Sequence, residues 1–325
     1  MRNIMETDVD LFGQTTTVKP DSVVAQRFIE MPFTILDTKS GRWNERKRAW
    51  KNSGIDSELG RDTNSGEMSD NATMNVPKIN GFSYNKDGSK KESDLDGKKN
   101  VASIFDPVVC ELMYTWFSKA GSQVVDCFAG GSVRGVVAGS LDRKYYGIDL
   151  REEQIKANVQ QAKDLIPNAD VKYVCGDSNA LIKDAPDADF IFSCPPYFNL
   201  EIYSDKPDDL SNMTQEGFDE VYASIIKKTC DKLKDNRFAC FVVGDYRTKD
   251  GNYANFTGKT VQAFLDAGLK LYNEAILATP IGTAMLRAGK QFDAKRKLVK
   301  THQNVYVFLK GNAREASNYV MDKGE

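Results

Sequence analysis

The sequence predicts an α/β fold in which helices cover both faces of a mainly parallel, seven-stranded sheet. From about residue 101 onward, short apolar runs alternate with amphipathic segments, as in consecutive strand–helix–strand units. Before that point the chain is polar and rich in turn-forming residues. The 325 residues suffice for one large domain and an accessory region. We therefore expect an accessory region over 1–100 and the α/β domain over 101–325.

The α/β domain begins with a predicted helix at Pro107–Phe117, which has proline at its first position and Asp106 as N-cap. No helix is evident between the last two strands, so we expect an antiparallel return and a mixed sheet. The predicted strands are Gln123–Phe128, Lys144–Asp149, Val171–Cys175, Asp189–Ser193, Phe238–Val243, Leu271–Leu277 and Asn304–Leu309. The predicted helices between them are Val133–Ser140, Glu152–Leu165, Gly217–Leu233 and Lys259–Ala267.

The accessory region contains two segments with a structural signal. Residues 31–36 favour a short strand, and Trp43–Lys51 favours a basic helix. Trp43 and Trp50 are seven residues apart and share one helical face, so they serve either as core anchors or as wedges against DNA. Residues 62–100 are dominated by small and polar residues, which predicts a long, partly disordered loop.

Composition excludes several classes of protein. No apolar run is long enough for a membrane span, and the first ten residues lack the apolar core of a signal peptide, so we expect a cytoplasmic protein. The six cysteines form no C-x-x-C pair and His302 is the single histidine, which argues against a structural metal site. With a net charge of −2, any contact with nucleic acid must come from a local cluster of positive charge.

The carboxyl ends of the first three strands carry features of a nucleoside-binding site. The first strand runs into a turn of small residues at Gly130, where a backbone can approach a ligand closely. Asp149 ends the second strand about 20 residues later and is placed to accept two ribose hydroxyls. Asp177 follows the third strand and is placed to accept an adenine amino group. Both G-x-G-x-x-G and the P-loop pattern are absent, which argues against nicotinamide enzymes and nucleoside triphosphatases.

The fourth strand ends in Cys194-Pro195-Pro196-Tyr197. Two prolines remove two backbone donors and fix two φ angles, leaving rigid carbonyl groups at Cys194 and Pro195. Such carbonyls accept hydrogen bonds from an amino group, and Tyr197 provides a flat surface for stacking. A base that has been flipped out of a duplex requires both features.

In this order, the motifs resemble those of the amino-methyltransferases of DNA, which modify adenine N6 or cytosine N4: Asp126-x-Phe128-x-Gly130, Asp149, Asp177 and Cys194-Pro195-Pro196-Tyr197. The resemblance covers roughly residues 101–310. It is strongest to enzymes of bacteriophages and mobile elements, in which a segment like Phe105-Asp106-Pro107 precedes the glycine motif and helps to hold the methionine part of the cofactor.

The resemblance implies a Rossmann-like class I methyltransferase fold, S-adenosylmethionine as cofactor and double-stranded DNA as substrate, with a mild preference for adenine. The cofactor-binding residues it implies are Phe105, Asp106, Asp126, Phe128, Gly130, Asp149 and Asp177. The catalytic residues it implies are Cys194, Pro195, Pro196 and Tyr197. Two positions depart from the family pattern. Ser132 replaces a glycine, and Cys194 replaces the usual Asp, Asn or Ser and is a weaker acceptor, so Pro195 or Ser193 is expected to assist.

A basic connection between the last two strands is the candidate nucleic-acid contact. Its cations are Arg287, Lys290, Lys295, Arg296, Lys297 and Lys300, against Asp293 alone. By analogy with the family, residues 199–212, which include Tyr203, are expected to close over the flipped base. Two alternatives stay open: an amino-methyltransferase of RNA, and a degenerate methyltransferase fold that only binds nucleic acid. The recognition sequence and the oligomeric state are not predicted.

Overall fold

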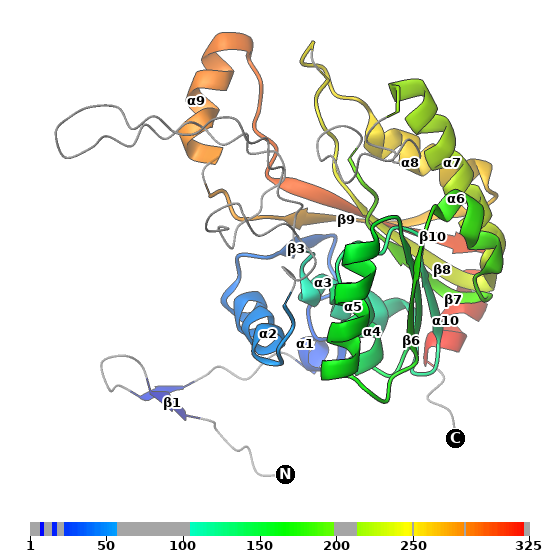
Figure 1. Ribbon diagram of the computed structural model, residues 1–325. Helices are drawn as coiled ribbons and strands as arrows, with labels where there is room; N and C mark the ends of the chain where they lie inside the picture. Colours follow the sequence, from blue (N-terminus) through cyan, green and yellow to red (C-terminus); the bar gives the residue numbers. More distant parts are fainter. Residues whose placement is uncertain are drawn as a thin grey trace. The chain divides into compact units, whose positions relative to one another are not determined.

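The computed structural model describes residues 7–9, 15–17, 23–56, 105–197, 213–248, 250–282 and 284–321 (Figure 1). The chain divides into two compact units, residues 1–33 and 34–325. In the first unit, β1 (Thr7–Val9) pairs antiparallel with β2 (Thr15–Thr17), and α1 (Val23–Phe28) follows. The second unit holds every residue to which the sequence assigns a function.

The second unit is built on one sheet with the order β3-β9-β10-β8-β7-β4-β5-β6 in the described part of the chain. The central and outer strands β4 to β8 pair in parallel, whereas β10 is antiparallel to both β8 and β9. The strands are β3 (Ile35–Asp37), β4 (Gln123–Asp126), β5 (Lys144–Asp149), β6 (Val171–Cys175), β7 (Ala188–Ser193), β8 (Leu233–Val243), β9 (Lys270–Ala278) and β10 (His302–Lys310).

This arrangement confirms the predicted Rossmann-like α/β fold, a mixed sheet flanked by helices (Figure 1). All seven predicted strands form, and the predicted antiparallel return is present between β9 and β10. The sheet has eight strands rather than seven because β3, from the predicted accessory region, pairs in parallel with β9.

The helices follow local sequence signals. Asp106 caps α3 as predicted, since its Oδ1 accepts a hydrogen bond from the amide of Val108 at 2.9 Å. The helices of this unit are α2 (Gly41–Asn52), α3 (Pro107–Phe117), α4 (Val133–Ser140), α5 (Glu152–Leu165), α6 (Ser178–Leu181), α7 (Gln215–Lys232), α8 (Phe256–Asp266), α9 (Ala284–Lys295) and α10 (Ala313–Met321). None of those described is long and apolar enough to cross a membrane.

The absence of a helix between the last two strands is a wrong prediction, because α9 lies there. Its larger apolar side chains, including Met285 and Phe292, are exposed rather than packed on the sheet. The segment therefore lacks the core-facing apolar stripe by which helices are recognised in a sequence.

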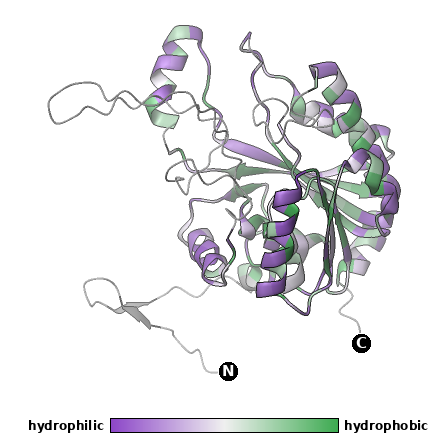
Figure 2. Ribbon diagram, viewed as in Figure 1, coloured by the Kyte–Doolittle hydropathy of each residue, from purple (hydrophilic) through white to green (hydrophobic). Residues whose placement is uncertain are grey.

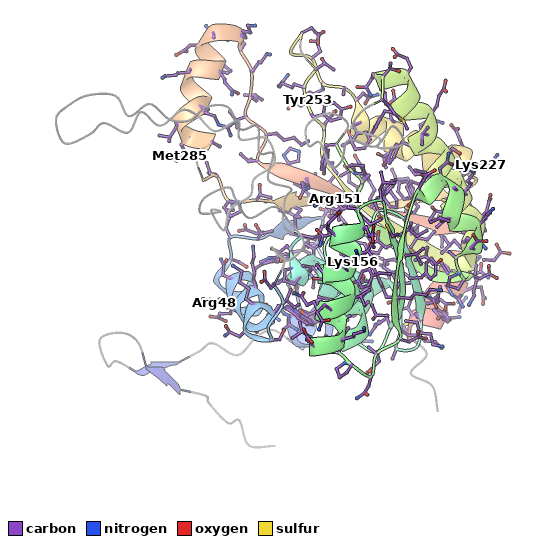
Figure 3. The ribbon with its side chains drawn as sticks, viewed as in Figure 1. Arg48, Arg151, Lys156, Lys227, Tyr253 and Met285 are labelled. Carbon is purple, nitrogen blue, oxygen red and sulfur yellow. The ribbon has the colours of Figure 1, made fainter. Side chains whose placement is uncertain are left out.

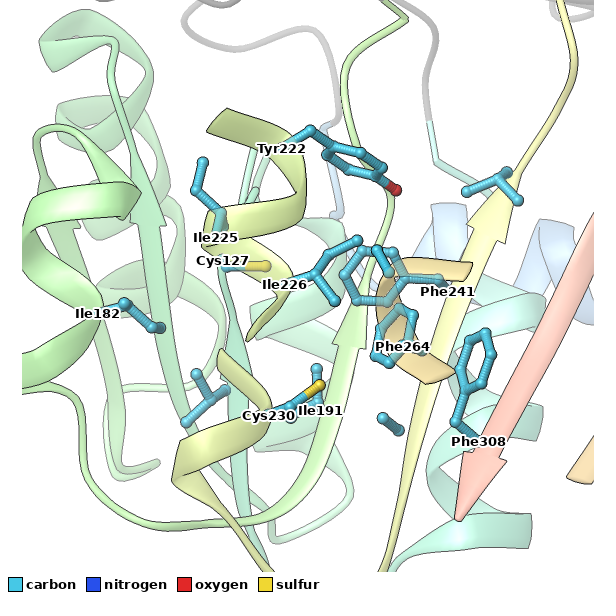
Figure 4. Packing of buried hydrophobic residues seen from close by; sticks show 14 of the residues in the cluster. Cys127, Ile182, Ile191, Tyr222, Ile225, Ile226, Cys230, Phe241, Phe264 and Phe308 are labelled. Atoms are coloured by element: carbon cyan, nitrogen blue, oxygen red, sulfur yellow. The ribbon is translucent and has the colours of Figure 1, made fainter. Parts of the chain in front are cut away.

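The core lies on both faces of the central strands. Every residue of β7 is buried, as expected for a parallel strand covered on both sides. On one face, Ile191 and Phe241 pack against Ile226, Phe264 and other apolar side chains (Figure 4). Hydrophobic residues accordingly concentrate in the strands and hydrophilic ones on the outer helix faces (Figure 2). This packing fixes the strand ends, from which the candidate site is built.

Residues 34–56, which the sequence places in the accessory region, belong to the same compact unit as the α/β sheet. Helix α2 docks on α3 through its basic aromatic face. Trp43, which is buried, donates from Nε1 to Oδ2 of Asp106 at 3.1 Å, and Trp50 donates to Oε2 of Glu111 at 2.9 Å. The two tryptophans are therefore core anchors. The predicted loop over 62–100 lies outside the described residues.

Candidate functional site

The predicted site residues follow four adjacent parallel strands. In the sheet, β7 pairs with β4, β4 with β5 and β5 with β6. The carboxyl ends of parallel strands share one edge of a sheet, and ligands of open α/β folds bind at that edge. Gly130, Asp149, Asp177 and Cys194 each come directly after one of these strands or end it. The tertiary structure therefore brings together residues that are up to 64 positions apart.

The turn around Gly130 that follows β4, here called the glycine turn, is hydrogen-bonded to Asp149. The amide of Gly130 donates to Oδ2 of Asp149 at 2.8 Å, and the amide of Arg151 donates to Oδ1 at 3.0 Å. Gly130 has φ = +51°, which favours glycine there. Burial raises the pKa of Asp149, while the two amide hydrogen bonds oppose that rise. A carboxylate has about four acceptor positions, so two remain for ligand hydroxyl groups.

Close packing of β5 against the turn also depends on a missing side chain. A Cβ at Gly147 would meet the Cβ of Ala129 at 2.9 Å. The glycine therefore lets the turn lie directly on β5.

Helix α5 also supports the glycine turn, a contact that the sequence analysis did not predict. Asn158, which is fully buried, donates from Nδ2 to the carbonyl of Gly130 at 2.7 Å. Gln154, also buried, donates from Nε2 to Oδ1 of Asn158 at 2.9 Å. The signal was available in the spacing, because Gln154, Asn158 and Gln161 lie on one face of a helix. Buried amides on that face predict a polar partner rather than an apolar core.

Asp126 holds strands together and does not face a ligand. Its carboxylate is completely buried and accepts four hydrogen bonds. The donors are the amide of Phe128 at 3.1 Å, Nε of Arg134 at 2.6 Å, the hydroxyl of Tyr145 at 2.7 Å and the hydroxyl of Ser193 at 2.6 Å. These donors fill about all of its acceptor positions. We therefore correct the predicted cofactor contact of Asp126 to a role in positioning the turn.

Arg134 completes this buried cluster. Its guanidinium also donates to the carbonyls of Phe128 and Ala129 in the glycine turn. Burial lowers the pKa of Arg134, but the Asp126 carboxylate, together with Tyr145 and Cys194, leaves that pKa raised. The ion pair between Arg134 and Asp126 thus holds the glycine turn from the side of the buried core.

Phe105 and Asp106 of the Phe-Asp-Pro segment are both expected to contact the cofactor, and the structure gives their side chains other contacts. Both oxygens of Asp106 are occupied within the fold, Oδ1 by the helix cap and Oδ2 by Trp43 and Lys47. This occupancy corrects the predicted cofactor contact of the Asp106 carboxylate. The ring of Phe105 lies under the guanidinium of Arg134, 4.7 Å from ring centroid to Cζ. Phe105 is thus placed beside the glycine turn.

Phe128 and Asp177 line the same strand ends. The half-buried ring of Phe128 packs against Tyr222, with ring centroids 6.0 Å apart. Asp177 caps α6, since its Oδ1 accepts from the amide of Asn179 at 2.8 Å. Its Oδ2 has no hydrogen-bond partner among the described residues, so one carboxylate oxygen is available to a ligand.

The residues of the diproline motif differ in their exposure to solvent at the end of β7. Ser193 is completely buried and its hydroxyl is bound to Asp126, so it cannot assist Cys194. Cys194 and Pro196 are partly exposed, whereas Pro195 and Tyr197 are buried. Cys194 follows the last residue of β7 and lies within electrostatic range of the buried Arg134 and Tyr222.

Tyr197 is anchored by two elements that the sequence analysis did not connect to it. Its ring packs edge-on against Phe256 at the start of α8, with centroids 5.8 Å apart. Its hydroxyl accepts a hydrogen bond from Nε2 of Gln303 at 3.1 Å. Gln303 belongs to β10, next to His302, whose pKa is lowered by burial and by Lys300. The segment over 199–212 that is expected to cover the base lies outside the described residues.

The cations of the basic connection divide into two groups. Arg287, Lys290 and Lys295 lie on α9, and Arg296 follows it with its guanidinium 5.0 Å from the ring centroid of Phe292. Lys297 and Lys300 instead lie against the segment 245–256. Of the six, Lys290, Lys295 and Arg296 are exposed and the others are half-buried.

No family model and no curated protein matches this sequence. Among solved structures, the chain is similar to TrmN from Thermus thermophilus, with a TM-score of 0.43 and 14% identity. That match covers 63% of this chain and 49% of TrmN, about half of its length.

Two further solved structures are named as methyltransferases. One is a precorrin-6y C5,15-methyltransferase from Geobacter metallireducens GS-15, with a TM-score of 0.42, 14% identity and coverage of 66% of this chain and 92% of that chain. The other is a magnesium protoporphyrin IX methyltransferase from Synechocystis PCC 6803 with bound SAM, with a TM-score of 0.39, 11% identity and coverage of 59% and 71%. We transfer none of these activities to the present chain.

Proposed function

We propose that this chain transfers a methyl group from S-adenosylmethionine to the exocyclic amine of a flipped base in double-stranded DNA. One observation carries the proposal: the glycine turn and the diproline motif meet on a single carboxylate oxygen. Oδ1 of Asp126 accepts hydrogen bonds from the amide of Phe128 and from the hydroxyl of Ser193. The residue that opens the turn and the residue before Cys194 are thereby held side by side. Donor and acceptor subsites of a group transfer require such proximity.

The residues present fit S-adenosylmethionine. Asp149 retains acceptor capacity for the two ribose hydroxyls, and Asp177 retains one oxygen for the adenine amino group. The backbone of the turn at Gly130 permits close approach of the cofactor. When bound, the cofactor supplies an electrophilic methyl group on a sulfonium ion.

The diproline motif supplies the other half of the reaction. The carbonyl oxygens of Cys194 and Pro195 accept hydrogen bonds from the exocyclic amine, because neither following proline offers an amide to occupy them. Such hydrogen bonds favour the pyramidal amine, whose lone pair attacks the methyl carbon. Methyl transfer to the amine would break the bond from the methyl carbon to sulfur, leave a neutral thioether and release one proton to solvent. The protein thus supplies geometry rather than a nucleophile.

Cys194 is the position at which the motif departs from the family. Because Ser193 is engaged by Asp126, the Pro195 carbonyl must carry the acceptor role that Asp, Asn or Ser shares elsewhere. We therefore expect Cys194→Asp to increase the turnover of methyl transfer and to leave the cofactor dissociation constant unchanged. Cofactor binding without transfer in both proteins would favour the degenerate, binding-only alternative.

The direct test is transfer of labelled methyl groups to nucleic acid. The protein is incubated with S-adenosylmethionine and either duplex DNA or RNA, and the products are digested to nucleosides. We expect label in N6-methyladenine from DNA, or in N4-methylcytosine. Label in RNA alone would replace the DNA proposal by the RNA alternative. Lys227→Ala, at an exposed position on α7, is the matched surface control (Figure 3).

A further inference from the structure

Between β8 and α8 the chain forms an arm, which the structure describes over residues 245–248 and 250–256 and which is here called the Tyr253 arm. Arg247 and Tyr253 form an antiparallel bridge, and the amide of Ala254 donates to the carbonyl of Tyr246 at 2.9 Å. The amide of Thr248 donates to the carbonyl of Asn252, also at 2.9 Å. Figure 3 shows Tyr253 on this arm, beyond the edge of the sheet. These hydrogen bonds tie the two sides of the arm to each other.

The base of the Tyr253 arm adjoins the diproline motif. Asp245 closes the base, because its Oδ1 accepts from the amides of Tyr246 at 2.9 Å and Phe256 at 3.1 Å. Tyr246 and Phe256 are both buried, with ring centroids 5.8 Å apart. Phe256 is also the ring against which Tyr197 packs. The base of the arm therefore lies next to Tyr197, the residue that we assign to base stacking.

Three cations gather on the arm. The guanidinium of Arg247 lies on the ring of Tyr253, with Cζ 4.0 Å from its centroid, and the ammonium of Lys300 lies 5.9 Å from the same centroid. Lys297 packs over Gly251, where a Cβ would overlap its ammonium group. Tyr253 itself is 44% exposed. A tyrosine ring stacked against an arginine places the planar guanidinium in a fixed orientation.

These three cations form no ion pair among the described residues, and the carboxylate of Asp245 acts on Lys300 only over a longer distance. Arg247 donates from Nη1 to the carbonyl of Gly251 at 2.9 Å, which leaves the other N–H groups without a described acceptor. The one carboxylate at the tip, Asp250, is bound to Thr248 and Asn252. The cations of α2 differ, because Arg46 and Lys47 are paired with Glu111 and Asp106.

We propose that the Tyr253 arm binds the backbone phosphates of the DNA strand beside the flipped nucleotide, through Arg247, Lys297 and Lys300. The proposal rests on the function proposed above and adds Arg247 and Tyr253 to the DNA-binding surface. The guanidinium of Arg247 matches the geometry of a phosphate group. The protein has a net charge of −2, so binding of DNA requires a local cluster of positive charge, and the three cations next to the diproline motif supply it.

The test measures binding of a fluorescent duplex over a range of salt concentrations, together with methyl transfer and calorimetric binding of S-adenosylmethionine. Arg247→Ala should weaken DNA binding roughly tenfold and reduce the salt slope by about 1, since one phosphate contact is lost. Arg247→Lys should keep the slope and lose part of the affinity. Tyr253→Ala should weaken binding, because the guanidinium loses its support, and Tyr253→Phe should restore it. The affinity for S-adenosylmethionine should be unchanged in all four variants.

Two matched controls sit elsewhere on the fold. Lys227→Ala removes an exposed cation on α7, and Tyr272→Ala removes a tyrosine that is 47% exposed at the opposite edge of the sheet. Both should bind DNA like the unmodified protein. If Arg247→Ala and Tyr253→Ala also do so, in a protein that binds and methylates DNA, the arm proposal is wrong and the proposed function stands. If the unmodified protein neither binds nor methylates DNA, both proposals fail. Tighter binding of RNA than of duplex DNA overturns the choice of ligand.

Discussion

The hydroxyl of Ser193 lies 2.6 Å from Oδ1 of Asp126 and joins the carboxyl end of β7 to that of β4. The same carboxylate is paired with Arg134, which in turn binds the glycine turn through the carbonyls of Phe128 and Ala129. One buried ion pair thus fixes the distance between the subsites that we assign to the methyl donor and its acceptor. Damage to this cluster should disturb both subsites together.

The first prediction concerns this ion pair. Asp126→Ala leaves the guanidinium of Arg134 buried without its carboxylate, and breaking a buried pair in this way costs about 3–5 kcal/mol. We expect the free energy of unfolding, measured by urea denaturation, to fall by that amount. Ser193→Ala should cost only about 1–2 kcal/mol, because it removes one hydrogen bond. The exposed Asp187→Ala serves as control. A loss for Asp126→Ala no larger than this control would contradict the prediction.

The second prediction concerns the ribose contact. Asp149→Ala removes the two charge-assisted hydrogen bonds that we propose to the cofactor ribose, and the loss of even one such bond is worth about 1.5–3 kcal/mol. We expect the calorimetric dissociation constant for S-adenosylmethionine to rise by roughly tenfold to a hundredfold. DNA binding in the absence of cofactor should be unaffected. An unchanged dissociation constant would remove Asp149 from the cofactor site.

The third prediction is a pH dependence. Burial raises the pKa of Asp149, so its carboxylate is neutralised at a higher pH than an ordinary aspartate. Cofactor affinity should therefore decline on acidification through a pKa above 3.8, and Asp149→Asn should abolish this decline. In the cofactor-free protein, the pKa of Asp149 is higher in the folded state than in the unfolded state, so protonation of Asp149 stabilises the fold. This stabilisation is complete at a pH below the pKa of Asp149 in the unfolded chain, and it is lost as the pH rises through the pKa in the folded protein. The free energy of unfolding, measured relative to Asp149→Asn, should therefore fall between these two pKa values.

The fourth prediction separates the ring of Tyr197 from its hydroxyl. Tyr197→Ala removes the stacking surface, which is worth about 1–3 kcal/mol per base, so kcat/KM for DNA should fall roughly tenfold to a hundredfold. Tyr197→Phe keeps the ring, loses the hydroxyl with its hydrogen bond from Gln303, and should retain most of the activity. Both variants should bind S-adenosylmethionine normally. Equal activity of Tyr197→Ala and the unmodified protein would exclude a stacking role.

The fifth prediction concerns the amides of α5. Asn158→Ala leaves the Gly130 carbonyl without its donor, so the turn should loosen and the KM for S-adenosylmethionine should rise several-fold, with a smaller change in kcat. Asn158→Asp should be worse than Asn158→Ala, because it places a carboxylate against that carbonyl. A variant that is less stable but has an unchanged KM would indicate that Asn158 supports the fold alone.

By itself, the sequence determined the fold class and most of the element boundaries. The helices Pro107–Phe117 and Glu152–Leu165 form as predicted, because the Asp106 cap of the first and the apolar spacing of both are local signals. The motifs at Gly130, Asp149 and Cys194 could also be found, since each follows a strand and the edge they share is dictated by parallel pairing.

Only the tertiary structure decided which groups remain available to a ligand. Asp126 and Asp149 look equivalent in the sequence, yet the first is enclosed by four donors and the second keeps acceptor capacity. Likewise, Arg46 and Lys47 of α2 are paired with Glu111 and Asp106, whereas the cations around Tyr253 form no ion pair among the described residues. Burial and pairing depend on contacts between distant segments, and local patterns of residue type do not encode them.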